Sequence, residues 1–446
     1  MEFSPWVLFT DIGLISLLLL VGTIIRAKVK FVQRLFLPAS IIAGLLGLLL
    51  GPNGIGILPF SGQIGTYPGI LIAIIFGTLP LLSPRIDWNA IKTRVGSMWS
   101  YSQLAMLLMW GAGLLFALVL INPFWDNLHD GFGLLLAGGF VGGHGTAAAL
   151  GDTFAQNGWE EARDLAMTSA TVGIISAITI GILFIKRGSA KGHTSFLASF
   201  DELPDELRTG LIPHESRKKS LTDTVSSISI DPYIFHIAIV SIIAMGGYYL
   251  SKLGVMLLPS VAIPAFSLAF LVGLFVKKIL TSTNTEKYVS TDVINRLSGS
   301  ATDVLVAFGI ASISISVVMD YAVPLIMLFV FGLVYAYIFF AIMSKRFFPE
   351  YWFEKGIFTW GWTTGTVAMG MALLRIVDPE AKSKTLDDYG LAYIPIAPVE
   401  ILLITFAPLL VLNSQGYLFV GITFVGGLII YLMAVKYKWL VRTQKN

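Results

Sequence analysis

The stretch GGFVGGHGTAAALGD, residues 138–152, is the part of this chain whose residue types could do chemistry. Glycine-rich backbone that is not held in a regular helix offers free N–H and C=O groups to a solute. N–H groups at a helix N-terminus suit an anion such as a carboxylate. Carbonyls and the Thr146 hydroxyl suit a dehydrated Na⁺. His144 could donate to an anion or order the loop, but a lone histidine cannot build a metal site.

A second stretch, TWGWTTGTVAMGM at residues 359–371, echoes the first. Its segment TGTVAMGM (364–371) resembles HGTAAALG (144–151), since both carry Gly-Thr followed by small residues. Thr363, Thr364, Gly365 and Thr366 are therefore expected to provide the same kind of backbone and hydroxyl groups. For single glycines elsewhere, close helix packing is the better interpretation.

Three acidic residues fall within apolar segments, where a charge is costly and suggests a functional role. Glu400 lies beside IPIAPVE and is the candidate for binding a proton or a coupling cation. Asp11 and Asp303 lie near the ends of apolar runs and could reach water instead. Arg375 is expected to anchor the chain at the membrane interface rather than to bind a solute.

The composition determines which elements must hold these residues. The chain has 446 residues, of which 55% are hydrophobic and 13% charged, and its mean hydropathy is +0.79. These values indicate an all-α polytopic membrane protein. The absence of cysteine excludes disulfides and thiolate chemistry. The first apolar run has no basic region before it, so it is expected to be a retained span.

About 20 apolar residues are needed for a helix to cross the bilayer. The predicted spans are 6–26, 36–51, 68–82, 97–121, 164–185, 232–252, 258–276, 298–319, 321–343, 389–413 and 417–437. Two further apolar segments, 131–150 and 356–374, are crowded with glycine, threonine and small residues. Whether these two segments cross decides the topology.

The positions of Lys and Arg indicate that both segments are re-entrant hairpins. Basic residues concentrate in cytoplasmic loops. If 131–150 crossed, an acidic loop would lie inside and a basic loop with Lys186 and Arg187 outside. With both segments re-entrant, only Arg163 and Lys252 of the 30 basic residues lie outside. This topology places the N-terminus outside and the C-terminus in the cytoplasm.

The polar stretch 186–231 is predicted to be a cytoplasmic linker between two halves of opposite orientation. Residues 1–185 form the first repeat and 232–413 the second, each with five spans and one hairpin, and 414–446 adds a final span and tail. Inverted repeats of this kind are common in secondary transporters. Two hairpins that enter from opposite faces would meet near the midplane and enclose a site.

The stretch GGHGTAAALGDTFAQNGWEEARDLAMTSATVG, residues 142–173, resembles the signature of the bacterial sodium:glutamate symporter family. In that family a Gly-Gly-His-Gly-Thr hairpin precedes an acidic outer loop and a span with Ala-Thr-x-Gly, here Ala170, Thr171 and Gly173. The order of segments, the polar linker and the length agree over most of the chain. The second hairpin departs from the family pattern, which has a Gly- and Ala-rich segment with a histidine where this chain has Trp362 and Thr363.

The resemblance implies Na⁺-driven glutamate uptake by alternating access, with no cofactor besides Na⁺ as coupling ion. Combined with the two stretches above, it gives a set of substrate- and ion-site candidates: Gly142, Gly143, His144, Gly145, Thr146, Thr171, Thr363, Thr364, Gly365, Thr366 and Glu400. Thr146, Thr171, Thr364 and Thr366 are the expected Na⁺ ligands among them.

Two other functions remain open from the residues. One is a transporter of another small carboxylate, coupled to Na⁺ or to H⁺ through Glu400. The other is a channel, although the sequence lacks a repeated filter motif. An enzyme is not expected, because no nucleophile–base pair, His-Glu-x-x-His or phosphate loop is found. The expected partners are glutamate, Na⁺, the bilayer of the cell membrane and a second copy of the chain in a homodimer, with no nucleic acid.

Overall fold

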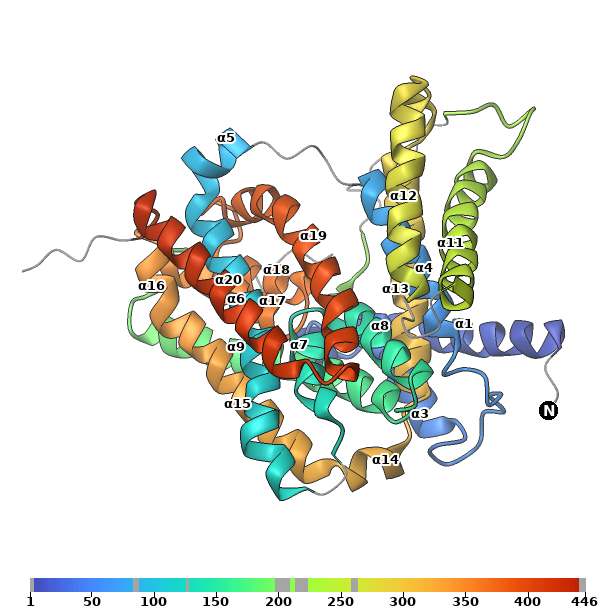
Figure 1. Cartoon of the computed structure of the whole chain (residues 1–446), viewed down its shortest axis with the longest axis horizontal. Helices are drawn as coiled ribbons and strands as arrows, with labels where there is room; N and C mark the ends of the chain where they lie inside the picture. Colours follow the sequence, from blue (N-terminus) through green and yellow to red (C-terminus); the bar gives the residue numbers. More distant parts are fainter. Residues whose placement is uncertain are drawn as a thin grey trace, which may run out of the picture. The chain divides into compact units, whose positions relative to one another are not determined.

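The computed structural model describes residues 4–82, 88–125, 128–196, 209–212, 224–257 and 264–440 (Figure 1). Within these ranges the chain forms α-helices with short 3₁₀ and π segments, and no strand. The predicted all-α fold is therefore confirmed. Parts of the predicted segments lie outside the described residues: 197–208 and 213–223 of the linker, the first part (258–263) of one span, and 441–446 of the tail.

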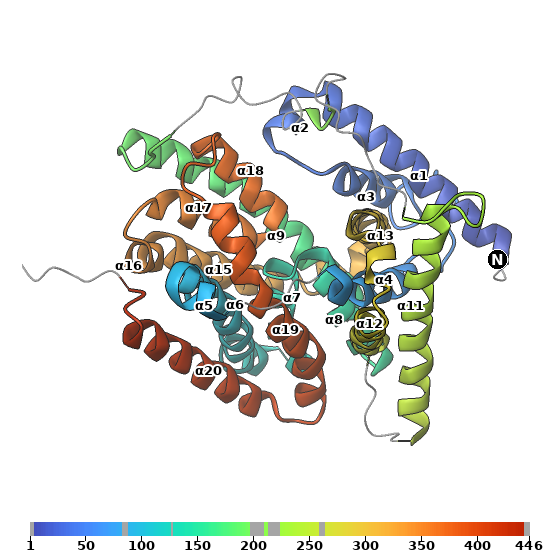
Figure 2. The same ribbon diagram turned by 90° about the horizontal axis from the view of Figure 1, so that it is seen from above.

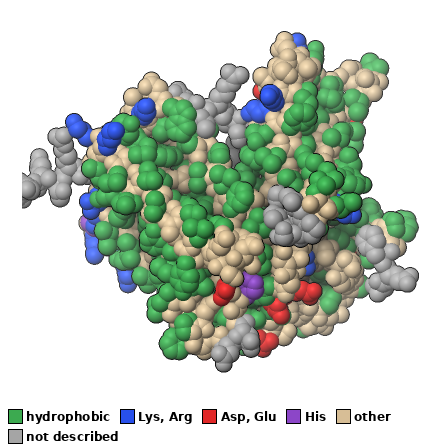
Figure 3. Space-filling view, in the orientation of Figure 1, with side chains coloured by type: hydrophobic (Ala, Val, Ile, Leu, Met, Phe, Trp, Pro, Cys, Tyr) green, Lys and Arg blue, Asp and Glu red, His purple; other side chains and the backbone are tan. Residues whose placement is uncertain are grey.

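Eight helical segments are long and apolar enough to cross a membrane, within the described part of the chain. They are Pro5–Lys28 (α1), Ile91–Phe124 (which contains α6, Gly96–Phe116), Ala162–Ala190 (α9), Pro232–Leu257 (α11), Ala265–Ser282 (α12), Ala322–Phe347 (which contains α15, Ala322–Ile338, and α16, Ser344–Phe347), Thr385–Leu412 (α19) and Gly416–Lys436 (α20). Figure 3 shows apolar side chains spread over the visible face, as expected where lipid rather than water is the solvent. The chain is a multi-pass membrane protein.

Three predicted spans fall on helices outside these eight. Two are short, Ala39–Leu50 (α3) and Tyr67–Leu82 (α4). The predicted span 298–319 is instead two helices, Thr291–Ala311 (α13) and Ile315–Asp320 (α14). The break falls at Ser312–Ser314, where the Ser312 hydroxyl donates to the Gly309 carbonyl at 3.0 Å. Serine side chains compete with the helix for backbone partners, which explains the interruption.

One boundary differs at the end of the first half. The predicted span 164–185 continues to Ala190, so Lys186 and Arg187 lie in the last turns of α9 rather than in the linker. Basic residues favour a helix C-terminus, and long cationic side chains can leave the apolar layer from such positions.

The chain divides into two compact units, and each unit draws on both halves of the sequence (Figure 1). The first unit contains residues 1–23, 39–84 and 212–313. In it, α4 packs against α11, α12 and α13, and α3 packs against α13. A Cβ on Gly273 would lie 2.3 Å from the carbonyl oxygen of Gly77, so these two glycines permit the close approach of α12 and α4.

Asp11 is buried in the first unit and is fully satisfied there. Its carboxylate accepts hydrogen bonds from the Ser61 N–H (3.0 Å), the Ser61 hydroxyl (2.5 Å) and the Tyr67 hydroxyl (2.8 Å). Three donors compensate the cost of burying this carboxylate. Asp11 therefore ties α1 to the segment before α4, and Asp303 is exposed on α13.

The second unit contains residues 24–38, 85–211 and 314–446, and it holds both segments for which a re-entrant hairpin is predicted. The first is α7 (Leu134–Phe140) with α8 (Gly143–Gln156), and the second is α17 (Trp352–Thr364) with α18 (Val367–Val377). The long helix α9 packs against all four of these helices. Figure 2 shows α17 and α18 beside α9.

Candidate functional site

The first helix break lies between Phe140 and Gly143, inside the predicted hairpin 131–150. Gly143 has φ of +62°, a left-handed conformation that side chains strongly disfavour. This conformation redirects the chain so that α8 starts a new axis. Of the described side chains, none caps the N-terminus of α8. The first N–H groups of a helix have no intrahelical partner, so this terminus is suited to an anion.

The second break lies at Gly365 and Thr366, inside the predicted hairpin 356–374. The Thr366 hydroxyl accepts a hydrogen bond from the Met369 N–H at 3.3 Å and so caps α18. The two arms are closely packed, because a Cβ on Gly361 would lie 2.6 Å from the Gly370 Cα. The echo between the two stretches thus corresponds to two helix–break–helix elements.

The two breaks touch each other. A Cβ on Gly143 would lie 3.1 Å from Cγ2 of Thr366 and 3.2 Å from the carbonyl oxygen of Gly365. Gly142, Gly145 and Thr366 are partly exposed, whereas their neighbours Gly143 and Gly365 are buried. Two interrupted helices from opposite ends of the sequence therefore place backbone polar groups at one point. We call this point the crossing and define it by residues 141–146 and 363–366.

Helix α9 lies directly against the crossing. A Cβ on Gly173 would lie 2.3 Å from the carbonyl oxygen of Thr364, and a Cβ on Gly365 would lie 3.1 Å from the Ala177 Cβ. The Trp360 indole N–H donates to the Ala177 carbonyl at 2.9 Å, which fastens α17 to the same helix. Gly173, the glycine of the Ala-Thr-x-Gly motif, therefore allows the backbone of α9 to lie close to the second break.

His144 links the first break to α9. Its Nε2 lies 3.1 Å from the Thr171 hydroxyl oxygen, and that hydroxyl donates to the Met167 carbonyl at 2.8 Å. Because the Thr171 proton is used on Met167, Thr171 accepts from the histidine, and the ring proton is on Nε2. The Nδ1 of this neutral ring is then an acceptor, and it has no hydrogen-bond partner among the described residues. His144 is 2% exposed, so this empty acceptor is buried.

The Ser169 hydroxyl is a second buried polar group without a hydrogen-bond partner among the described residues, and the sequence analysis does not predict it. A Cβ on Gly139 would lie 2.3 Å from the Ser169 oxygen. Ser169 therefore faces α7, on the same helix as Thr171. The sequence signal for this residue is its position two residues before Thr171 in the same predicted span.

The predicted threonines differ in their surroundings. Thr146 is 3% exposed and covers Gly142, since a Cβ there would lie 2.1 Å from the Thr146 Cβ. The hydroxyls of Thr363 and Thr364 donate to the carbonyls of Thr359 (2.8 Å) and Trp360 (2.6 Å) in their own helix. Their oxygens keep lone pairs that could face a cation.

Glu400 is not brought to the crossing by any contact recorded for it in the described residues. It lies partly buried in α19, where its carboxylate accepts a hydrogen bond from the Tyr393 hydroxyl at 2.9 Å. The helix continues through Pro395 and Pro398 without a break. The described residues also contain no group of three or more His, Asp or Glu that could hold a metal ion.

The entrance of the first hairpin is fixed by His129. Its Nδ1 accepts a hydrogen bond from the Gly131 N–H at 3.0 Å, and its ring stacks on Trp159 at 4.3 Å between centroids. On the return side, Arg163 pairs with Asp152 at 2.7 Å. Together these contacts hold the start of the hairpin against the segment that follows it.

The comparisons with known proteins add the family. No curated protein matches this chain. Among solved structures, the chain is similar to the sodium proton antiporter MjNhaP1 from Methanocaldococcus jannaschii at pH 8. The identity is 16% and the TM-score 0.38, over 94% of this chain and 100% of the other. A likeness this low carries no argument about fold or function.

The sodium/glutamate symporter family matches residues 127–349, which is half of the chain. The matched range contains the first hairpin and all of α9, and it ends before the second hairpin begins at Trp352. The helix breaks, the His144–Thr171 contact and this match lead to one conclusion: the chain is a membrane transporter that belongs to the sodium/glutamate symporter family.

Proposed function

We propose that this protein is a Na⁺-coupled symporter that takes up glutamate at the crossing of its two broken helices. The observation that carries the proposal is the buried, unpartnered Nδ1 of His144. Glutamate brings an ammonium group and two carboxylates. An ammonium donates to such an acceptor, and an unmet buried acceptor costs about 1–3 kcal/mol, so a substrate that fills it gains affinity.

The uncapped N-terminus of α8 suits a substrate carboxylate. Gly145, in the first turn of α8, is partly exposed there, and the first N–H groups of a helix have no partner within the helix. The family match ends before the second hairpin, and the bulky Trp362 lies in that hairpin. Discrimination between glutamate and similar carboxylates is therefore assigned to the second hairpin.

Na⁺ is proposed to bind through oxygens. Thr146, Thr171, Thr364 and Thr366 remain the assigned hydroxyl ligands, with the Gly365 carbonyl beside them. Hydroxyl and carbonyl oxygens suit Na⁺ and require no carboxylate cluster. Each Na⁺ that enters with the membrane potential contributes about 2.3 kcal/mol per 100 mV.

Alternating access is proposed to follow from the two inverted repeats, 1–185 and 232–413, joined by 186–231 and followed by the additional span in 414–446. In support, the first unit takes α1, α3 and α4 from one repeat and α11, α12 and α13 from the other. The second unit takes one hairpin from each repeat. We assign the moving part to the unit with the hairpins, the N-terminus to the outside and the C-terminus to the cytoplasm.

Proton coupling is the second candidate, because Glu400 and Tyr393 form a hydrogen-bonded pair inside α19. A carboxyl in a membrane helix can carry a proton. Uptake that follows a pH gradient without Na⁺ and disappears in Glu400→Gln would favour this coupling. Uptake that requires Na⁺ and persists in Glu400→Gln would favour Na⁺.

The test is uptake of radiolabelled glutamate into liposomes that contain the purified chain. We expect accumulation with an inward Na⁺ gradient and none with K⁺ on both sides. Gly145→Val should remove it because a branched side chain there blocks the crossing, and Thr146→Val should remove it because it deletes the hydroxyl at nearly unchanged volume. Aspartate and glutarate are added as unlabelled competitors to define the substrate class.

Two results would contradict the proposal. One is the absence of Na⁺-dependent accumulation in protein that is folded by its melting profile. The other is full uptake in both valine variants, since the crossing would then have no part in transport.

A further inference from the structure

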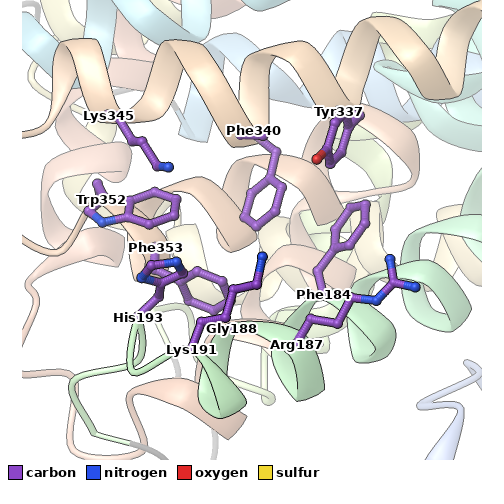
Figure 4. Close-up of a pocket in the computed structure, with 11 residues that line it drawn as sticks. Phe184, Arg187, Gly188, Lys191, His193, Tyr337, Phe340, Lys345, Trp352 and Phe353 are labelled. Atoms are coloured by element: carbon purple, nitrogen blue, oxygen red, sulfur yellow. The ribbon is translucent and has the colours of Figure 1, made fainter.

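A cavity separate from the crossing lies where α9 ends, beside the ends of α15 and α16 and the start of α17 (Figure 4). Its volume is about 200 Å³. Three cations line it: Arg187 and Lys191 from the end of α9, and Lys345 from α16. Figure 4 shows Lys191 and Lys345 reaching toward the cavity from opposite sides. All three cations belong to the second unit.

In the part of the chain that the structure describes, no carboxylate forms an ion pair with Arg187, Lys191 or Lys345. The Lys345 ammonium instead lies 4.5 Å from the centre of the Trp352 ring. Lys191 is held by the helix end, where the turn through Gly192 (φ +67°) lets the His193 N–H bond back to the Gly188 carbonyl at 2.9 Å. The three cations therefore line one cavity, and none of them has an ion-pair partner among the described residues.

The other wall of the cavity is aromatic and belongs to the two candidate spans. Phe184 of α9 stacks on Phe340 at 4.9 Å between centroids and meets Tyr337 of α15 at 5.5 Å. Tyr337 is 48% exposed. Arg187 lies one turn beyond Phe184 along α9, toward the helix end. The cavity thus has cations at the end of the spans and exposed aromatic surface one turn closer to the membrane interior.

This arrangement matches a molecule with a phosphate at one end and hydrocarbon at the other. A guanidinium binds phosphate oxygens in bidentate fashion, and lysines add point charges. A free phosphate would use the cations but leave the aromatic wall unused. We propose that the cavity binds the headgroup phosphate of an anionic phospholipid, whose acyl chains lie along Phe184 and Tyr337.

Such a lipid would connect α9, which lies against the crossing, with the second hairpin, which forms part of it. Arg187 is on the helix that carries Thr171, Lys191 directly follows that helix, and Trp352 is the first residue of the second hairpin. The bound headgroup would bridge these two elements at the membrane surface. The proposal concerns binding, so its test does not depend on transport or on the substrate.

The experiment measures retention of phosphatidylglycerol by the delipidated full-length protein, using native mass spectrometry with phosphatidylcholine as competitor. We expect a preference for phosphatidylglycerol in the wild type. Each of Arg187→Gln, Lys191→Gln and Lys345→Gln should weaken it about fivefold, because one basic residue near anionic lipid contributes about 1 kcal/mol. The triple variant should lose the preference.

The matched control removes two lysines and one arginine elsewhere: Lys278→Gln, Lys287→Gln and Arg296→Gln, all exposed residues of the first unit. It should keep the preference. Inorganic phosphate, added in place of the lipid competitor, should not displace phosphatidylglycerol.

Three outcomes would overturn the proposal. The triple variant could retain the wild-type preference, or the control could lose it to the same extent. Displacement by inorganic phosphate at the concentration of the lipid would identify a simple anion site instead. If the triple variant does not fold, Lys191→Gln decides the result, since Lys191 is exposed and follows the last residue of α9.

Discussion

The Nε2 of His144 lies 3.1 Å from the hydroxyl oxygen of Thr171, and this contact joins the first helix break to α9. The Thr171 hydroxyl donates its own hydrogen bond to the Met167 carbonyl. These two hydrogen bonds fix the histidine tautomer and leave Nδ1 as an acceptor without a hydrogen-bond partner among the described residues. The contact therefore determines both where the ring lies and what it can bind.

Thr171→Val is expected to abolish or strongly reduce uptake and to lower the free energy of unfolding by about 1–3 kcal/mol, because it leaves the His144 donor unsatisfied. Thr171→Ser keeps the hydroxyl and should transport. The matched control is Thr179→Val in the same helix, where the hydroxyl bonds only to the Ile175 carbonyl at 2.7 Å. Uptake and thermal unfolding of the three variants check this, and equal effects at both threonines would contradict it.

His144→Ala is expected to change selectivity as well as affinity. If Nδ1 accepts from the substrate ammonium, the variant should lose affinity for glutamate but not for glutarate, which has two carboxylates and no ammonium. The loss corresponds to about 1–3 kcal/mol, or roughly 5- to 150-fold in the dissociation constant. Competition binding with both ligands measures the ratio. An equal loss for both ligands would show that His144 only positions the break.

Gly173→Ala is expected to displace the second hairpin. Its Cβ would lie 2.3 Å from the Thr364 carbonyl oxygen, which is backbone and cannot rotate away. Overpacking of this kind costs about 1–3 kcal/mol, and uptake should fall with it. Gly421→Ala in α20 is the control, since no described atom lies within 4 Å of its Cβ position. A wild-type unfolding temperature in Gly173→Ala would contradict the close contact.

His129 should make the entrance of the first hairpin sensitive to acid. Burial lowers the pKa of His129 below its ordinary value of 6.5, and the Asp130 carboxylate offsets part of this. Because the folded pKa is below the unfolded one, the stabilisation is complete above pH ~6.5 and is lost as the pH falls toward the folded pKa. Protonation also removes the acceptor for the Gly131 N–H.

Thermal unfolding across this pH range measures the effect. The wild type should lose stability on acidification through pH ~6.5, and His129→Asn should lose less. Parallel pH profiles for the two proteins would contradict a role for His129.

Much of this architecture could be predicted from the sequence. The apolar runs gave the all-α membrane fold, and glycine and threonine within apolar segments located both helix breaks, at residues 141–142 and 365–366. These are local features, because backbone freedom and hydropathy are properties of short stretches. The family signature in residues 142–173 agrees with the match over 127–349.

Contacts between residues far apart in the chain could not be predicted from the sequence. The approach of Gly143 to Thr366 joins residues far apart in the chain, and the empty Ser169 hydroxyl depends on how α7 packs on α9. Glu400 was grouped with the site because it is an acid in an apolar run, yet its partner is Tyr393 in its own helix. From the sequence, the cations at the end of α9 indicate only topology, because the cavity that they line together with Lys345 exists only in the folded chain.

The most direct measurement is glutamate binding to the purified protein in Na⁺ and in K⁺, for the wild type and Gly145→Val. Coupling between two ligands is reciprocal, so a symporter must bind glutamate more tightly as Na⁺ rises. The account predicts binding that depends on Na⁺ in the wild type and is absent in Gly145→Val. Glutamate binding of equal affinity in K⁺, or unchanged binding in Gly145→Val, would contradict a Na⁺-coupled glutamate site at the crossing.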